Sequence, residues 1–300
     1  METPLRQIIG VDLGGSAIKL GRFTPEGHCT ASLTVATPEP STPIAVIEAM
    51  ANAVTRLDPD RQGGAIGVGT PGPADVTGRV ARVAINLAGW QDVPLAQALE
   101  DRTQRPTVIA NDANCAGLGE FWLGAGQRYQ DMILLTLGTG VGGAVILGGH
   151  LFTGRRGTAG ELGLITLNFD GPPCNSGNSG SLEQYCSIRG IRRETGLEPQ
   201  VLAAKAEAGD ADAIAFWQQY GRRLGAGLAS LIYVLTPEAV ILGGGISAGA
   251  ALFIPALKQE ITERVLPTSR PDLEILIAQL GNQAGVVGAA KLALQTFSEG

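Results

Sequence analysis

Two glycine-rich bends of the same design constrain this chain more than any other feature of its sequence. The first lies in residues 9–21 (IGVDLGGSAIKLG) and the second in residues 134–146 (LLTLGTGVGGAVI). Each has an apolar strand, a glycine bend and a second apolar strand. Glycine bends bring bare backbone N–H groups close to an anion. We therefore expect two halves of similar design, with a polyphosphate such as that of ATP bound between them.

Other readings of these bends are weaker. A single glycine-rich hairpin is usually only a tight turn. The second bend also fits the pattern G-x-G-x-x-G through Gly138, Gly140 and Gly143, but a dinucleotide-binding fold needs a helix directly afterwards. Residues 144–149 (AVILGG) read as strand and turn instead, and the phosphate-binding pattern G-x-x-x-x-G-K-[ST] does not occur. The sequence favours two hairpins.

Composition narrows the class of protein. The chain has 300 residues, 44% of them hydrophobic, which is enough for one large domain or two ordinary ones. A net charge of −6 argues against nucleic-acid binding, which favours basic patches. No apolar run reaches the ~18 residues of a membrane span. The four cysteines are Cys29, Cys115, Cys174 and Cys186. They form no C-x-x-C pair, and this pattern is typical of a protein in the reducing cytoplasm.

The order of predicted elements indicates an α/β protein whose pattern begins twice. The first half has strands within 8–35, at 65–69 and at 107–110, and helices at 42–57, 93–102 and 111–124. The second half has strands at 131–137, 143–147, 239–242 and 273–280, and helices at 182–194, from 199, at 210–235, 248–265 and 284–297. Thr42 before Pro43 predicts a helix N-cap followed by the first helical residue.

Five polar residues stand where chemistry could occur. Asn111 and Asp112 lie where a buried strand ends and a helix begins, which is where reactive groups tend to lie in α/β proteins. Glu161 follows the second bend, Glu183 opens a helix, and Asn86 lies between apolar neighbours. Each has an ordinary explanation by itself, as a helix cap, a first-turn acid, a loop acid or a turn amide. Together, carboxylates and amides beside two phosphate-binding bends suit a polyol.

A series of motifs resembles the ROK family of sugar kinases, which includes bacterial ATP-dependent glucokinases. The resemblance covers nearly the whole chain, and its motifs are specific when taken in this order. They are VDLGGS at 11–16 with Lys19, GTPG at 69–72, NLAGW at 86–90, NDAN at 111–114 with Gly119-Glu120, LGTGVGG at 137–143, AGELG at 159–163 and GGGI at 243–246.

This resemblance implies an actin-like ATPase fold with two RNase H-like lobes and a cleft between them. We expect a small N-terminal lobe of residues 1–117 plus 284–300 and a large C-terminal lobe of residues 118–283. We also expect a cytoplasmic homodimer whose ligands are a small sugar and ATP, with no nucleic acid and no membrane as partner.

The resemblance also implies a role for each site residue. Asp112 is expected to act as the general base, and the sugar is expected to contact Asn86, Asn111, Glu161, Glu183 and Gly72. The residues expected to bind ATP are Asp12, Gly14, Gly15, Ser16, Lys19, Thr139, Gly140, Gly243, Gly244 and Gly245. Asp12 is placed to hold Mg²⁺ through water, because Mg²⁺ keeps much of its hydration shell. Thr139 could donate to a terminal phosphate oxygen.

The sequence departs from the family at its zinc motif. Members commonly have a His just after the GELG-type segment and then C-x-C-G-x-x-G-C-x-E. Here Leu164 stands at the His position, and Cys174 is followed by Ser176 and Ser181 at the other two cysteine positions. One thiolate cannot make a tetrahedral zinc site. We therefore expect no structural zinc, and the missing His leaves the choice of sugar open.

The favoured activity is transfer of the γ-phosphoryl group of ATP to the 6-hydroxyl of glucose, with Mg²⁺. Three alternatives stay open: a kinase for another hexose or an N-acetylated amino sugar, a kinase that uses polyphosphate as donor, and a non-catalytic sugar-sensing regulator. ROK-like repressors carry a DNA-binding segment ahead of the kinase-like part. A first strand at Ile8 leaves no room for one, and the presence of Asp112 also disfavours a regulator.

Overall fold

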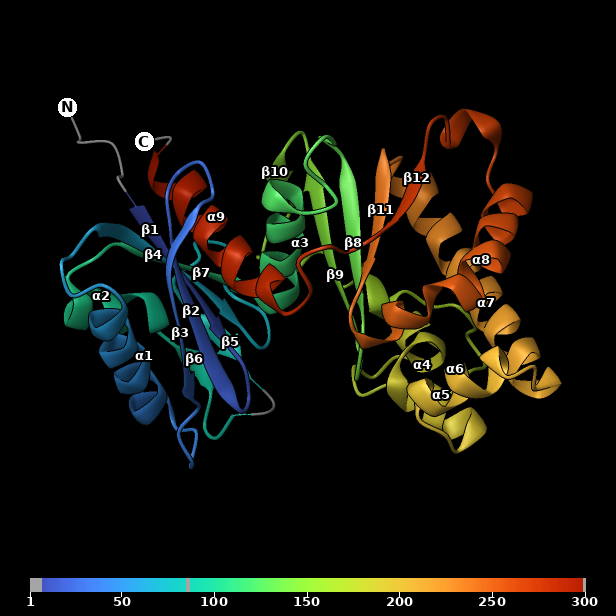
Figure 1. The fold of residues 1–300 in the computed structure, drawn as a ribbon, viewed down its shortest axis with the longest axis horizontal. Coiled ribbons are helices and arrows are strands. Elements are labelled where there is room, and N and C mark those ends of the chain that lie inside the picture. The colour runs from blue at the N-terminus through green and yellow to red at the C-terminus, as the bar shows by residue number, and fades with distance from the viewer. Residues whose placement is uncertain (1–6, 85–86, 299–300) are drawn as a thin grey trace. The chain divides into compact units, whose positions relative to one another are not determined.

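The computed structural model describes residues 7–84 and 87–298, which form two compact units (Figure 1). Unit 1 comprises Met1–Arg128, His150–Gly160 and Leu280–Gly300, and unit 2 comprises Tyr129–Gly149 and Glu161–Gln279. Residues 118–128, 150–160 and 280–283 therefore belong to unit 1, whereas the boundaries expected from the sequence put them in the large lobe.

Unit 1 is built on a five-stranded sheet of order β3-β2-β1-β4-β7. The strands β1, β2 and β3 pair antiparallel, and β4 and β7 continue the sheet in parallel. A separate two-stranded sheet, β5-β6, was not predicted. The bounds are β1 Gln7–Leu13, β2 Ala17–Phe23, β3 Cys29–Ala36, β4 Gly63–Thr70, β5 Ala81–Val83, β6 Gln91–Val93 and β7 Thr107–Asn111.

Helices cover both faces of this sheet, because successive side chains of a strand point to opposite sides. In β1, Ile9 and Val11 join a buried cluster with α1 (Pro43–Leu57) and α2 (Leu95–Thr103), whereas Ile8 packs in a cluster with α9 (Ala284–Ser298). The predicted Thr42 cap is confirmed, since its side chain accepts from the Ala45 N–H and Pro43 opens α1.

The helix α3 (Asp112–Leu123) packs closely against α9, and Figure 1 shows the two adjacent. Glycine makes this approach possible. A Cβ atom on Gly288 would overlap the carbonyl of Cys115, and one on Gly119 would overlap the carbonyl of Ala284. The position of α3, which begins at Asp112, is therefore fixed by backbone-to-backbone contact with α9.

A buried ionic cluster around Asp58 connects the end of α1 to the start of β4 in unit 1. The Asp58 side chain is fully buried and accepts from Arg22 Nη1 at 2.6 Å and Arg105 Nη2 at 2.6 Å. It also accepts from the backbone N–H groups of Gln62 and Gly63, both at 2.9 Å. Burial alone would raise the pKa of this carboxyl, but these hydrogen bonds and charges outweigh it and hold the pKa below its usual value.

Unit 2 repeats the design of unit 1. Its strands run in the order β9-β8-β11-β12, with β8 and β9 antiparallel and β11 and β12 parallel to β8. This matches the order β2-β1-β4-β7, so the repeat predicted from the two bends is confirmed. The bounds are β8 Met132–Leu137, β9 Val141–Leu147, β11 Ala239–Gly243 and β12 Glu274–Ile277; β10 (His150–Leu151) opens the next segment of unit 1.

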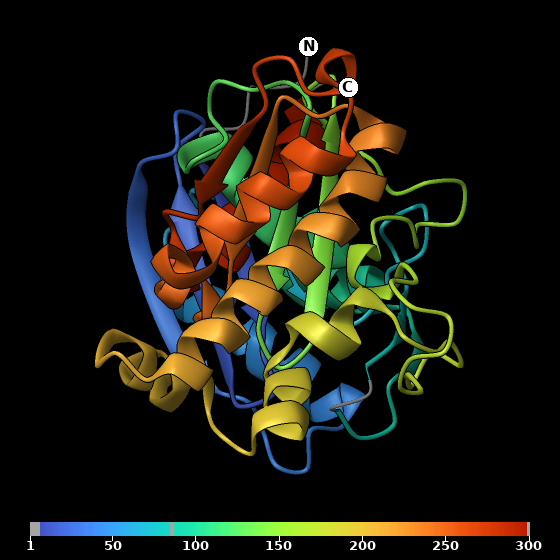
Figure 2. The same ribbon diagram turned by 90° about the vertical axis from the view of Figure 1, so that its right-hand side faces the viewer.

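The helices of unit 2 pack over a large apolar core. Figure 2 shows the long α7 (Ala211–Leu235) lying along α8 (Ala250–Arg264). The rings of Trp217, Tyr220 and Phe253 meet between them, with centroids 5.0 to 6.0 Å apart. Among the described residues, no helix is both long and apolar enough to cross a membrane.

Two predicted helices differ from the structure. The helix expected at 182–194 is divided into α4 (Leu182–Cys186) and α5 (Ile188–Thr195), followed by α6 (Pro199–Glu207). Ser187 is extended (ψ 166°), and its hydroxyl caps α5 by accepting from the Gly190 N–H. The helix expected from residue 248 begins at Ala250, because residues 245–249 form a 3-10 turn. A side-chain cap inside an apolar run is not visible in hydrophobic spacing.

Candidate functional site

Asp12 lies near the end of β1, beside the first glycine bend. It pairs in register with Lys19 of β2 and Gly69 of β4. The Lys19 Nζ atom is 3.9 Å from Asp12 Oδ2 and also donates to the carbonyl of Asn282 at 3.2 Å. Burial raises the pKa of Asp12, and the charge of Lys19 lowers it only in part. The result is a partly desolvated carboxylate that would gain from a cation.

The N-terminal turn of α9 approaches the same carboxylate. A Cβ atom on Gly285 would lie 2.9 Å from Asp12 Cγ and 3.0 and 3.1 Å from its two oxygens. A helix N-terminus carries partial positive charge, which favours an anion there. Gly285 belongs to an apolar helix in the sequence (AGVVGAA), and no local pattern marks it as part of a site.

Asp112 is the first residue of α3 and follows β7 directly. The Asn111 Oδ1 atom caps the helix by accepting from the N–H groups of Ala113 at 2.9 Å and Asn114 at 3.4 Å. Solvent reaches the Asp112 carboxylate, although protein surrounds much of it. That desolvation raises its pKa, and the negative charge of Asp12 raises it further. The structure thus brings together two carboxylates that the sequence placed on separate elements.

The first bend itself presents open backbone. The Gly14 N–H donates to the carbonyl of Ala17 at 2.9 Å, which closes the turn between β1 and β2. Gly15 and Ser16 are exposed, and a Cβ atom on Gly15 would meet nothing within 4 Å. A ligand therefore has room above the bend.

Gly72 and Asn86 of unit 1 are also expected to contact the sugar. Gly72 has a φ of 102°, and a Cβ atom there would overlap the carbonyl of Val83, so glycine is required. Asn86 lies outside the described residues.

The second bend, in unit 2, is tied to Glu183. The Gly138 N–H donates to the Gly140 carbonyl at 2.9 Å and closes the turn, leaving Thr139 exposed. The Val141 N–H donates to Glu183 Oε2 at 2.9 Å, and a Cβ atom on Gly140 would overlap that same oxygen. A predicted phosphate bend and a predicted sugar ligand are thus in direct contact.

Glu161 lies on the same part of unit 2. It is exposed and directly precedes a short 3-10 turn, Leu162–Leu164. This turn rests on the second bend, because a Cβ atom on Gly163 would overlap the carbonyl of Val141. Glu183 and Gly140 are therefore in contact at the second bend, and the turn that follows Glu161 packs against Val141 of the same bend.

The triple glycine after β11 packs against β8. Gly244 has a φ of 83°, and a Cβ atom there would overlap the backbone of Leu137, so the turn depends on glycine. Gly244 and Gly245 are exposed. Beside them lies a cavity of about 200 Å³, whose walls include Ala203, Trp217 and Gly245. The turn contacts Leu137 at the end of β8, directly before the second bend, and the cavity walls combine apolar residues with Gln200 and Glu207.

The loop around Cys174 is held by its own hydrogen bonds. The N–H of Cys174 donates to the Asn178 carbonyl at 2.7 Å, and Asn178 Nδ2 donates to the Leu164 carbonyl at 3.1 Å. Burial would raise the pKa of the Cys174 thiol, but the polar groups of Ser176, Ser181 and Gln184 beside the sulfur outweigh it and lower the pKa. Ser176 and Ser181, which stand at two cysteine positions of the family motif, therefore both lie near the one remaining sulfur.

Metal ligands are sparse in these surroundings. Within residues 7–84 and 87–298, no three His, Cys, Asp or Glu side chains come together as a metal site. The absence of structural zinc stays a prediction that requires elemental analysis.

Comparison with known proteins identifies the family. The ROK family model matches residues 8–296. The chain is 33% identical to the glucokinase of Thermotoga maritima, over 96% of this chain and 98% of that protein. A ROK hexokinase structure from Thermus thermophilus matches with a TM-score of 0.87 and 35% identity, covering 98% of this chain and 100% of the other.

A second solved structure carries ligands. The ROK family glucokinase from Streptomyces griseus, in complex with glucose and AMPPNP, matches with a TM-score of 0.79 and 35% identity over 96% of this chain and 99% of the other. The matched relatives also include an N-acetyl-D-glucosamine kinase and xylose repressors. The expected α/β fold, that of actin-like ATPases, is confirmed. The chain belongs to the ROK family.

Proposed function

We propose that this protein is an ATP-dependent sugar kinase that transfers the γ-phosphoryl group of ATP to the 6-hydroxyl of glucose. The observation that carries the proposal is the juxtaposition of Asp12 and Asp112, both with raised pKa, beside a glycine bend at which Gly15 and Ser16 are exposed. Two carboxylates of different surroundings suit two tasks, one toward a metal and one toward a proton. The similarity to glucokinases over nearly the whole chain supports glucose as the acceptor.

Asp112 acts as the general base. Its carboxylate accepts the proton of the 6-hydroxyl while that oxygen bonds to the γ-phosphorus, and the bond from phosphorus to the β–γ bridging oxygen breaks to release ADP. The raised pKa favours this task, because a more basic carboxylate takes a hydroxyl proton more readily. The Asn111 cap fixes the first turn of α3 and with it the position of Asp112.

Asp12 holds Mg²⁺. One carboxylate is sufficient, because protein-bound Mg²⁺ usually keeps several waters and takes its other ligands from substrate phosphates. The partly desolvated carboxylate of Asp12 fits such a role. When bound, the ion would neutralise charge on the phosphates. Lys19, 3.9 Å from Asp12, adds a second positive charge at the same bend.

The remaining residues bind the two substrates. Gly14, Gly15 and Ser16 in unit 1 and Thr139 and Gly140 in unit 2 offer donors to the phosphates of ATP. The adenosine lies against the turn formed by Gly243, Gly244 and Gly245, beside the 200 Å³ cavity. The sugar hydroxyls bind Asn86, Asn111, Glu161, Glu183 and the backbone at Gly72.

A purified-protein screen tests the proposal. ADP release is measured with ATP and excess Mg²⁺ for glucose, other hexoses and N-acetylglucosamine, and the glucose product is identified as the 6-phosphate. We expect turnover to be fastest with glucose. Faster turnover of N-acetylglucosamine, the sugar named for one relative, would reject the substrate and keep the class. Absence of turnover with every sugar would reject the class.

We further propose that the enzyme is a cytoplasmic homodimer.

A further inference from the structure

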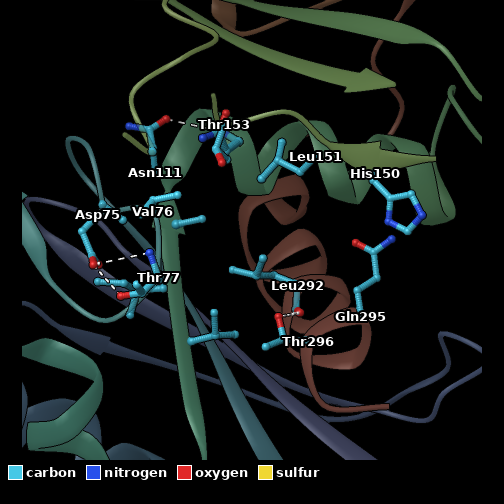
Figure 3. A pocket seen from close by; sticks show the side chains of 17 residues that line it. Asp75, Val76, Thr77, Asn111, His150, Leu151, Thr153, Leu292, Gln295 and Thr296 are labelled. Atoms are coloured by element: carbon cyan, nitrogen blue, oxygen red, sulfur yellow. Dashed lines mark hydrogen bonds between the residues drawn. The ribbon is translucent and has the colours of Figure 1, made fainter. Parts of the chain in front are cut away.

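Unit 1 contains a hollow that the proposed reaction does not use. Its volume is about 360 Å³, within the range of small-molecule pockets. Figure 3 shows its walls: the turn at residues 74–78, the end of β7, residues 150–157 and the last turns of α9. Of the described residues assigned above to sugar or ATP, Asn111 alone lines it.

One wall carries an amide side chain that makes no hydrogen bond to another described residue. Asn114, in the first turn of α3, is 4% exposed and lines the hollow. Its backbone N–H donates to Asn111, but no hydrogen bond joins its side-chain amide to any other residue in the described part of the chain. The amide oxygen and nitrogen of Asn114 are not among the fully buried atoms that lack a partner, so they stay accessible from the hollow and can pair with a ligand or water there.

The other polar groups of the hollow favour an uncharged ligand. Among the described residues that line it there is no lysine or arginine, so an anion would find no cationic partner. The Asp75 carboxylate is already satisfied, since it accepts from Thr77 and from the N–H groups of Arg79 and Val80. The backbone and hydroxyl donors around Asp75 also hold its pKa below the usual value despite burial, which raises it.

Hydroxyl-binding and apolar groups alternate around the same space. Thr153, Thr296 and His150 supply polar atoms, and the Thr296 hydroxyl can still accept because it donates to the Leu292 carbonyl at 2.8 Å. Leu151 and Leu292 supply aliphatic surface, and Figure 3 shows both among these polar groups. A sugar has both hydroxyl groups and apolar C–H faces, so its surface is complementary to this lining.

We propose that this hollow binds a neutral monosaccharide at a second site, separate from the reacting sugar. The Asn114 amide pairs with its hydroxyls, and the aliphatic side chains cover its C–H face. Because Asn114 and Asn111 both belong to the start of α3, occupancy restrains the turn that carries Asp112. The second sugar is therefore an effector of the base and not a substrate.

Equilibrium dialysis with radiolabelled glucose tests the site without reference to turnover. Thr296→Trp fills the hollow, and Thr262→Trp is the matched control, since each threonine is exposed on a helix and donates to the carbonyl four residues earlier at 2.8 Å. We expect about two glucose molecules per chain for the wild type and for Thr262→Trp, and one for Thr296→Trp. Identical isotherms for Thr296→Trp and the wild type would overturn the proposal.

A second variant separates binding from folding. Asn114→Leu keeps the branched outline of the side chain and replaces its amide, which bonds no other described residue, with methyl groups, so the melting temperature should stay the same or rise. Affinity of the second site should fall about tenfold through loss of its hydrogen bonds. Unchanged affinity would also overturn the proposal. A protein without kinase activity that still lost one glucose in Thr296→Trp would refute the proposed function but support this site.

Discussion

Replacing Gly285 with alanine should damage metal use without damaging the fold. The added Cβ atom would lie 2.9 Å from Asp12 Cγ and 3.0 Å from Oδ1, closer than the 3.4 Å at which ordinary contact begins. The Asp12 carboxylate would have to move by about 0.5 Å or more, and it can do so because it ends a flexible side chain. The three heavy atoms nearest to that Cβ position all belong to Asp12.

The magnitude follows from two opposing effects. Alanine inside a helix is more favourable than glycine by about 0.8–1.0 kcal/mol, so the melting temperature should hold or rise slightly. Misplacing a reacting group by 1 Å can cost about 10²-fold in rate. A shift of half that size predicts a fall in kcat of about tenfold and a weaker apparent affinity for Mg²⁺.

The assay combines three measurements. ADP release is titrated with Mg²⁺ at saturating ATP and glucose, Mn²⁺ binding is followed by electron paramagnetic resonance, and thermal melting reports the fold. Asp12→Ala with and without Gly285→Ala provides the control, since the added methyl should have no effect once the carboxylate is gone. Wild-type Mg²⁺ dependence in Gly285→Ala, or a melting temperature lowered by many degrees, would refute the reasoning.

Four further outcomes are expected. Asp112→Asn should lower kcat by about 10²–10⁴-fold with little change in glucose Kd; a kcat within a few-fold of the wild type would place the base elsewhere. Gly140→Val should raise the KM for the sugar as well as for ATP, because its side chain displaces Glu183; a change in the ATP constant alone would contradict that contact. Elemental analysis should find no stoichiometric zinc, and one tightly bound zinc per chain would mean that residues beyond Cys174 complete a site. Asp58→Asn should destabilise the protein by about 3–5 kcal/mol in urea unfolding at pH 7. Because the Asp58 pKa is lower in the folded chain, its contribution is present above pH ~4 and is lost as pH falls through the lower folded value; a variant whose stability depends on pH as strongly as the wild type would contradict this.

The sequence by itself determined the repeated design and most of the elements. Apolar alternation and glycine placement act within a few residues, so both hairpins, the Thr42 cap and the β7–α3 junction at Asp112 could be read locally. The β7–α3 junction also marked Asp112 as a site candidate from its local position, whereas Asp12 was assigned only through the resemblance to the ROK family. Where a side chain interrupts a run, as Ser187 does between α4 and α5, hydrophobic spacing alone predicted one helix and was wrong.

Only the tertiary structure decided which distant groups touch. Three features arise from the packing of separate elements: the approach of Gly285 to Asp12, the hydrogen bond from Val141 to Glu183, and the position of the Asn114 amide in the wall of the hollow. Such contacts depend on how closely two backbones approach each other. Glycine permits a close approach because it has no Cβ atom, but its presence in the sequence does not identify the group that approaches. The sequence does not distinguish a glycine needed for a turn from a glycine that leaves room for a carboxylate. The difference lies in the neighbouring atoms, which come from distant parts of the chain.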